Sequence, residues 1–306
     1  MSSFQKIKLV VVLLISSVLF WSCATQKLPV RTDPWDFDFE EIWPYLVRSA
    51  AVYESDEYIQ RNFGKDVFIV DPSNIKVKTF VETDSEKKLQ WIAVQGTDNL
   101  KNIKEDIQLA KVKDPILDIY LHRGFQKAAM KTYNAIKPKL KKDFSLKITG
   151  HSLGAAIAVI IEAYLHHDGY LIDKAITFGE PKLTNKEGME KLNSLPLLRV
   201  INHNDPVPLV PPVTLISSIH GIYRQFGAEL ILKNPPEFIL LKSHIADRFS
   251  VTSFWKNLGN IDVKDHHIAQ YCEYVYDFIF YPKKNSVAKQ SDLNKYNLSS
   301  CIIKEN

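Results

Sequence analysis

Apolar and polar residues follow two periods along most of the chain, one typical of strands and one typical of helices. Short runs rich in β-branched and aromatic residues predict strands. These runs lie at 66–71, 75–82, 88–95, 145–149, 174–178 and 198–202. Between them, apolar residues recur at helical spacing. The predicted helices span 39–53, 124–140, 153–167, 186–193 and 267–280.

The order of these elements predicts an α/β fold. Strands that alternate with helices form mostly parallel sheets, because each helix returns the chain to the edge where the previous strand began. We therefore expect a mostly parallel central sheet with helices on both faces. The segment FGAELILKNPPEFILLKSH, residues 226–244, predicts a hairpin that turns at Asn234-Pro235-Pro236.

The first 22 residues follow a different pattern. Lys6 and Lys8 precede an apolar run of 13 residues from Leu9 to Trp21. This run is shorter than the roughly 20 residues that a membrane-spanning helix needs, and it is typical of a signal peptide. It ends in LFWSC, which resembles a bacterial lipobox, in which the cysteine becomes lipid-modified after cleavage. We expect a signal peptide at 1–22 and a lipid on Cys23. Secretion without a lipid and an uncleaved membrane anchor are the alternatives.

Composition bounds the rest of the chain. With 306 residues, 45% apolar and 24% charged, it is ordinary for a globular protein. Two prolines and mixed polar residues predict a tether at 23–37, followed by one domain at 38–282 and a polar tail at 283–306. Loss of the signal peptide lowers the formal charge from +4 to +2, because it removes two lysines and no acid. A balance so close to zero gives no argument for nucleic-acid binding.

Candidate chemistry centres on residues 148–156, ITGHSLGAA. Gly150-His151-Ser152-Leu153-Gly154 has the G-x-S-x-G form of a nucleophile elbow, and it lies between a predicted strand and a predicted helix. A serine there needs a base and an oriented acid, which follow in the order Asp then His in α/β hydrolases. Asp205 follows a predicted strand, and His266 or His267 could be the base.

Several segments together resemble the class 3 lipases, the fungal-lipase-like α/β hydrolases. They are AVQGTDNLKNIKEDI, LHRGF, ITGHSLGAA, ITFGEPKLTN, RVINHNDPVPLVPP and DHHIAQY, in the family's order across about residues 90–272. The resemblance implies a nucleophile at Ser152, an acid at Asp205 and a base at His266, with His267 as its rival. It also implies an oxyanion hole formed by the backbone N–H groups of Thr97 and Leu153. This chemistry needs no metal or organic cofactor.

The resemblance also implies a lid at DNLKNIKEDI, residues 98–107. Leu100, Ile103 and Ile107 lie at helical spacing and give a narrow apolar stripe. A surface helix without a gating role is the alternative. The chain departs from the family pattern at Gln95, where arginine is usual, and at Glu180, where a small or neutral residue is usual.

Other polar residues have structural interpretations. His166 and His167 suit a helix end, and no metal-binding motif includes them. His122 and Tyr271 are interpreted as structural, the tyrosine as packing the last helix against the core. An exported compartment permits a Cys272–Cys301 disulfide, with a buried free thiol at Cys272 as the alternative.

The sequence thus predicts a lipid-anchored serine lipase or esterase. The resemblance implies acyl esters such as glycerolipids or phospholipids as substrates. The lipobox predicts a bacterial envelope membrane, and Ala24 favours the outer membrane because it does not resemble an inner-membrane retention signal. A non-catalytic lipid-binding lipoprotein of the same fold, and an acyltransferase or amide-cleaving hydrolase with the same triad, are the alternatives.

Overall fold

The computed structural model describes residues 38–64, 66–72, 77–96, 110–202, 205–215, 217–235, 237–241, 243 and 263–280. All of them belong to the compact unit Pro34–Asn306. The predicted signal peptide, Cys23, Thr97 and the three predicted lid residues lie outside the described residues, and the predicted domain bounds stay predictions. Within the described part of the chain, no helix is both long enough and apolar enough to cross a membrane.

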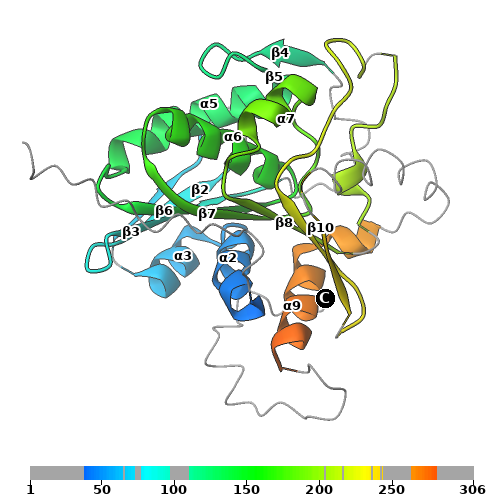
Figure 1. The fold of residues 1–306 in the computed structure, drawn as a ribbon. Helices are drawn as coiled ribbons and strands as arrows, with labels where there is room; N and C mark the ends of the chain where they lie inside the picture. Colours follow the sequence, from blue (N-terminus) through cyan, green and yellow to red (C-terminus); the bar gives the residue numbers. More distant parts are fainter. Residues whose placement is uncertain are drawn as a thin grey trace, which may run out of the picture. The chain divides into compact units, whose positions relative to one another are not determined.

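A central sheet of eight strands organises the described residues (Figure 1). The strands lie in the order β1-β2-β3-β6-β7-β8-β9-β10. Parallel pairing joins β3, β6, β7, β8 and β9, while β2 and β10 pair antiparallel at the two sides of this block. The strands are β1 (Val67–Val70), β2 (Thr79–Asp84), β3 (Leu89–Val94), β6 (Ser145–His151), β7 (Leu171–Phe178), β8 (Leu197–Asn202), β9 (Ala228–Leu232) and β10 (Phe238–Leu241).

Helices cover both faces of this sheet, which confirms the predicted fold class. Figure 1 shows α5 and α6 on one face and α2, α3 and α9 on the other. These helices are α2 (Phe39–Ala51), α3 (Asp56–Phe63), α5 (Arg123–Ile136), α6 (Leu153–His167) and α9 (Ile268–Phe280). The shorter α7 (Lys186–Leu192) and the 3-10 turns η2 (Lys137–Lys139), η3 (Val207–Leu209) and η4 (Val263–His266) lie in connections.

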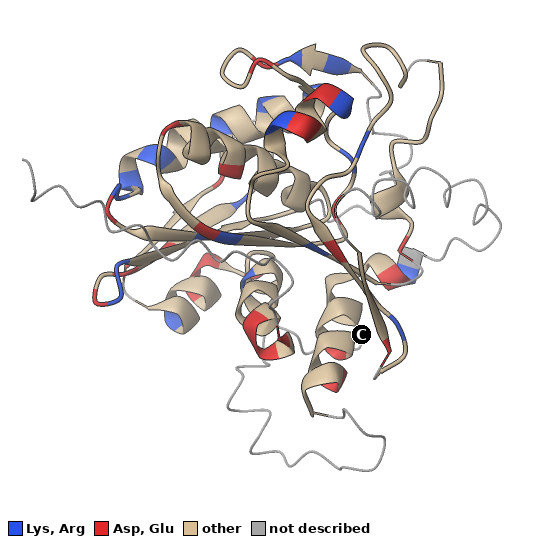
Figure 2. Cartoon of the chain, in the orientation of Figure 1, with Lys and Arg blue, Asp and Glu red and all other residues tan. Residues whose placement is uncertain are grey.

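The core follows from helix composition. Every residue of α6 from Gly154 to Leu165 is buried, because this helix lies between the sheet and α5. A helix that is apolar all round must be covered on all sides. In contrast, α5 is amphipathic, and Figure 2 shows its Lys and Arg residues on the outside. A second apolar cluster on the other face joins α2 and α9 to the sheet.

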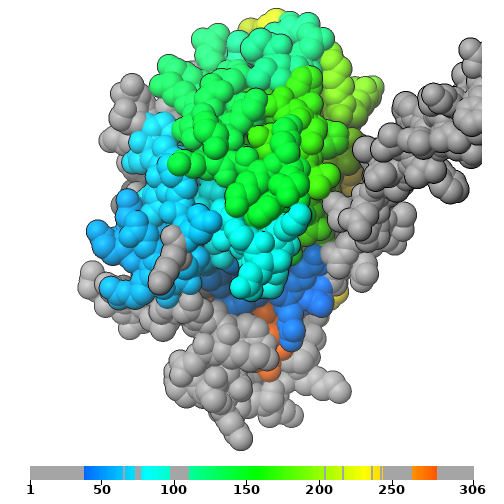
Figure 3. All heavy atoms as spheres, turned by 90° about the vertical axis from the view of Figure 1, so that its left-hand side faces the viewer, coloured from blue at the N-terminus to red at the C-terminus, as the bar shows by residue number. Residues whose placement is uncertain are grey.

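The parallel strands begin on one side of the molecule and end at the site. The side on which they begin is turned to the viewer in Figure 3, where the turn between β2 and β3 is visible. The residues that follow β6 and β8 lie at the other side of the sheet. This arrangement brings Ser152 and Asp205 to the same edge.

Some elements differ from the sequence expectations. The predicted helix 124–140 gives way to η2 after Ile136, because Pro138 lacks a backbone N–H. Helix α3 and the hairpin of β4 (Lys111–Lys113) and β5 (Tyr120–His122) were not predicted. The two strands are only three residues long, too short to show an alternating pattern.

Cys272 lies buried in α9 and is disulfide-bonded. The structure therefore excludes the free-thiol alternative. Cys23 and Cys301 lie outside the described residues, so the pairing of Cys272 with Cys301 stays a prediction.

Candidate active site

The turn between β6 and α6 places Ser152 in an unusual backbone conformation. Its φ of 59° and ψ of −134° lie outside the regions that side-chain-bearing residues favour, at a cost of about 1–3 kcal/mol. The two flanking glycines allow the turn. A Cβ atom on Gly150 would lie 2.5 Å from the carbonyl oxygen of Gly154, and one on Gly154 would lie 2.4 Å from that of Val94. The G-x-S-x-G spacing is thus a steric requirement of this turn.

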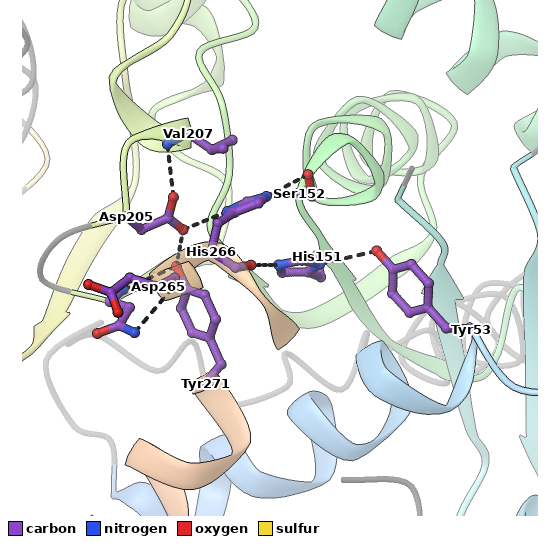
Figure 4. A network of polar contacts seen from close by, with 9 residues as sticks. Tyr53, His151, Ser152, Asp205, Val207, Asp265, His266 and Tyr271 are labelled. Carbon is purple, nitrogen blue, oxygen red and sulfur yellow. Dashed lines mark hydrogen bonds and ion pairs between the residues drawn. The ribbon is translucent and has the colours of Figure 1, made fainter. Parts of the chain in front are cut away.

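A continuous hydrogen-bond chain runs from this serine to the predicted acid (Figure 4). His266 Nε2 lies 2.7 Å from Ser152 Oγ, and His266 Nδ1 lies 2.7 Å from Asp205 Oδ2. All three side chains are buried. Ser152 follows β6, Asp205 follows β8 and His266 lies in η4, so three separate segments meet at this point.

Asp205 is held by three donors. Its Oδ1 accepts a hydrogen bond from the Val207 backbone N–H at 2.8 Å, while its Oδ2 accepts from His266 and from the Tyr271 hydroxyl at 2.5 Å. The Tyr271 oxygen in turn accepts from the Asn202 backbone N–H at 3.1 Å. Burial and the nearby Asp205 charge raise the pKa of Tyr271 well above its usual value, so Tyr271 keeps its proton. The interpretation of Tyr271 as a packing residue was therefore incomplete.

The two candidate bases differ in position. His266 is fully buried against Ser152, whereas the neighbouring His267 is exposed. His266 is the last residue of the 3-10 turn η4, whereas His267 follows this turn. The structure thus brings His266, and not His267, to the site.

The predicted oxyanion hole is described only at Leu153. This residue is the first of α6, so its backbone N–H has no acceptor within the helix. The positive end of the helix dipole also lies beside Ser152. Thr97 lies outside the described residues, and its part in the hole stays a prediction.

Three further histidines of the described residues have structural interpretations. His122 Nδ1 accepts a hydrogen bond from the Phe125 N–H at 3.3 Å and so caps α5. His166 and His167 end α6, as expected. Among the described residues, no group of three or more His, Cys, Asp or Glu side chains is placed to hold a metal ion.

Four buried charged side chains interact with one another, and they are Glu162, Glu180, Arg199 and Glu229. Arg199 and Glu229 stand opposite each other on the parallel strands β8 and β9, with Arg199 Nη2 2.5 Å from Glu229 Oε2. Glu180, one of the residues that depart from the family pattern, accepts a hydrogen bond from the Thr177 hydroxyl at 2.6 Å. Burial raises the pKa of Glu180 to about 7 and that of Glu162 well above its usual value.

Comparisons with known proteins address the predicted family. Residues 91–215 match the family model of the class 3 lipases. This stretch is therefore similar to the class 3 lipase domain. The chain is 31% identical over 169 residues to a secreted mono- and diacylglycerol lipase of Fusarium solani. This alignment covers 49% of this chain and 48% of the relative. It is 28% identical to a chloroplastic phospholipase A1 of Arabidopsis thaliana, over 33% of this chain and 17% of that one. The chain thus spans half or less of the length of these curated relatives.

Solved structures support the fold. Lipase II from Rhizopus niveus superposes with a TM-score of 0.62 at 20% identity, covering 74% of this chain and 92% of that one. At this identity the likeness confirms the α/β-hydrolase fold alone. The family match agrees with the predicted class, a serine hydrolase of the lipase and esterase type.

Proposed function

We propose that this protein is a serine hydrolase that cleaves carboxylic esters of lipids through an acyl-enzyme. The observation that carries the proposal is the buried chain from Ser152 through His266 to Asp205, built on a strained elbow. The match of residues 91–215 to the class 3 lipase model supports it. Serine attacks esters only when a base removes its proton and a third group orients that base. Both partners lie within hydrogen-bond distance here.

The geometry supports a defined sequence of proton transfers. His266 Nε2 takes the proton of Ser152 Oγ as this oxygen attacks the ester carbonyl, and it then gives the proton to the leaving alcohol. Asp205 accepts a hydrogen bond from the His266 Nδ1–H, which fixes the ring and stabilises its charged form. The backbone N–H of Leu153 stabilises the oxyanion. The sequence predicts that the backbone N–H of Thr97 does the same. Water attacks the acyl-enzyme by the same transfers in a second cycle.

An apolar segment that begins directly after Asp205 supports lipids as the substrate class. No Asp, Glu, Lys or Arg occurs between Asp205 and Arg224, and the described part of this segment carries no charge colour in Figure 2. Two of its side chains are exposed although they are apolar, Leu215 at 94% and Ile219 at 58%. Large apolar side chains held in water suit contact with acyl chains or a lipid surface. The glycerolipid and phospholipid activities named for the relatives agree with this choice.

The proposal includes a membrane location. A lipid on Cys23, after cleavage of residues 1–22, would anchor the chain to a bacterial envelope membrane, with the outer membrane favoured by Ala24. The basic start, the short apolar run and LFWSC support this part of the proposal. Metabolic labelling of the expressed chain with a radioactive fatty acid tests it. The label should be lost in Cys23→Ala.

Hydrolysis of p-nitrophenyl esters from acetate to palmitate by the full chain in non-ionic detergent tests the activity. Ser152→Ala should lower kcat by about 10⁴-fold or more and abolish labelling by a fluorophosphonate. Ser49→Ala is the matched control, because Ser49 is equally buried but bonds Thr149 instead. A folded wild-type chain with neither turnover nor label would contradict the proposal and favour a lipid-binding protein. Ester exchange with an added alcohol would indicate an acyltransferase.

A further inference from the structure

His151, the residue before the nucleophile, uses both of its ring nitrogens. Its Nδ1 lies 3.1 Å from the Tyr53 hydroxyl, and its Nε2 lies 2.7 Å from the backbone carbonyl oxygen of His266 (Figure 4). A carbonyl oxygen only accepts hydrogen bonds, so the proton of the neutral ring is on Nε2. The Nδ1 lone pair then accepts from the Tyr53 hydroxyl. The partners thus fix the tautomer of His151.

The chain of hydrogen bonds continues beyond Tyr53. The Tyr53 oxygen accepts from the Gly96 backbone N–H at 3.1 Å. The chain therefore has one direction, from the Gly96 N–H through the Tyr53 hydroxyl and the His151 ring to the carbonyl of His266. It joins the end of β3, the nucleophile elbow and the turn that carries the general base. Gly96 is also the residue before Thr97.

His151 stays neutral beside the base. Burial lowers the pKa of His151 well below the usual histidine value, and the nearby His266 and His267 act in the same direction. The two rings of His151 and His266 stack with centroids 4.7 Å apart. A neutral ring keeps its Nε2–H directed at the carbonyl while His266 gains and loses its proton during turnover.

The η4 turn is held from two sides by side chains that bond its carbonyl oxygens. Asn202 Nδ2 donates to the Asp265 carbonyl at 3.1 Å, and His151 Nε2 donates to the carbonyl of His266 itself. We propose that Tyr53 and His151 are positioning residues, which hold the His266 backbone so that its Nε2 stays within hydrogen-bond distance of Ser152. This inference rests on the ester hydrolysis proposed above. The hydrogen bonds described above join these two side chains to each other and to backbone groups, and not to Ser152 Oγ.

Three substitutions in the full chain test the inference with soluble p-nitrophenyl butyrate. His151→Phe keeps an aromatic ring but has no donor for the His266 carbonyl, and kcat per fluorophosphonate-labelled serine should fall about 10- to 100-fold, as small displacements of catalytic groups do. KM should change less than about twofold. Tyr53→Phe should lower kcat about 3- to 10-fold. His151→Gln retains an N–H donor and should recover part of the loss.

Tyr45→Phe is the matched control. Tyr45 lies in α2, the helix that leads to Tyr53, and its hydroxyl bonds the Lys174 carbonyl away from the site. Its loss should leave kcat per labelled serine unchanged. The double variant Tyr53→Phe/His151→Phe should lose no more activity than His151→Phe alone, because the two residues act in series.

The outcomes separate the inference from the proposed function. A wild-type chain without turnover or label overturns both. An active wild type in which His151→Phe and Tyr53→Phe keep kcat per labelled serine within about twofold overturns the inference alone. Equal losses in His151→Gln and His151→Phe also overturn it, because they indicate a role in packing. If His151→Phe does not fold, Tyr53→Phe is compared with Tyr45→Phe. A kcat per labelled serine that is about 3- to 10-fold lower in Tyr53→Phe supports the inference, and equal values overturn it.

Discussion

Loss of the Tyr271 hydroxyl should weaken both the stability and the activity of this protein. In Tyr271→Phe the aromatic ring remains in its place in α9, so no large cavity forms. Two contacts disappear, the hydrogen bond to Asp205 Oδ2 at 2.5 Å and the one from the Asn202 N–H at 3.1 Å. The substitution thus tests polar contacts with little change in packing.

The magnitude follows from these two contacts. A hydrogen bond to a charged acceptor contributes about 1.5–3 kcal/mol, and a buried N–H left without a partner costs about 1–3 kcal/mol. We expect the free energy of unfolding to fall by about 3 kcal/mol, or Tm by roughly 6–12 °C. Asp205 keeps its bonds to His266 and to the Val207 N–H. We therefore expect a moderate loss of kcat, about 10-fold, with KM unchanged.

Urea denaturation and p-nitrophenyl butyrate kinetics measure the two effects. Tyr274→Phe is the control, because Tyr274 lies on the same helix but is partly exposed and forms no hydrogen bond to Ser152, Asp205 or His266. It should change stability by less than about 0.5 kcal/mol. A Tyr271→Phe variant as stable and as active as Tyr274→Phe would refute the assigned role of the hydroxyl.

Two further predictions concern the buried charges. Glu180 binds its proton up to about pH 7 when folded and up to about 4.5 when unfolded, so the free energy of unfolding falls as pH rises through this window. Glu180→Gln has no carboxyl to titrate, so its free energy of unfolding does not fall for this reason. As pH rises from about 4.5 to 7, the free energy of unfolding of the variant relative to wild type should therefore increase by up to about 3 kcal/mol, measured by urea denaturation. Arg199→Met should destabilise the protein by about 3–5 kcal/mol, because it leaves Glu229 buried without its partner, whereas Arg199→Met/Glu229→Leu should recover most of that loss. A double variant no more stable than the single one would contradict this reasoning.

Elements with strong local signals could be predicted from the sequence. Helix α6 begins and ends at the predicted residues, because the elbow fixes its start and Asp168-Gly169 its end. Gly169 has a φ of 75°, a conformation that glycine adopts without strain and that commonly ends a helix. The parallel order of β6, β7 and β8 followed from the alternation of strands and helices. Periodicity therefore predicted the fold class, and the G-x-S-x-G motif between a strand and a helix predicted the position of Ser152.

Contacts between distant segments could not be predicted in this way. Tyr53 lies 98 residues before His151, and Tyr271 lies 66 residues after Asp205. Both tyrosines lie in apolar helical patterns, or at their ends, where a packing role is the usual interpretation. Only the folded chain shows which hydroxyl groups meet a buried acceptor. The choice between His266 and His267 depends in the same way on the rotation of one short turn.

The strained backbone at Ser152 explains why hydrogen bonds hold the site from several sides. Ser152 lies in a strained conformation, and its N–H donates to the Phe178 carbonyl of β7 at 2.9 Å. Strain of this kind persists only when the surrounding structure fixes the backbone on several sides. Here β7 holds the serine, and the network around Asp205 and His151 holds the acid and the base. We infer that the rigidity of the sheet edge, and not the three proposed catalytic side chains alone, sets the distances on which the proposed chemistry depends.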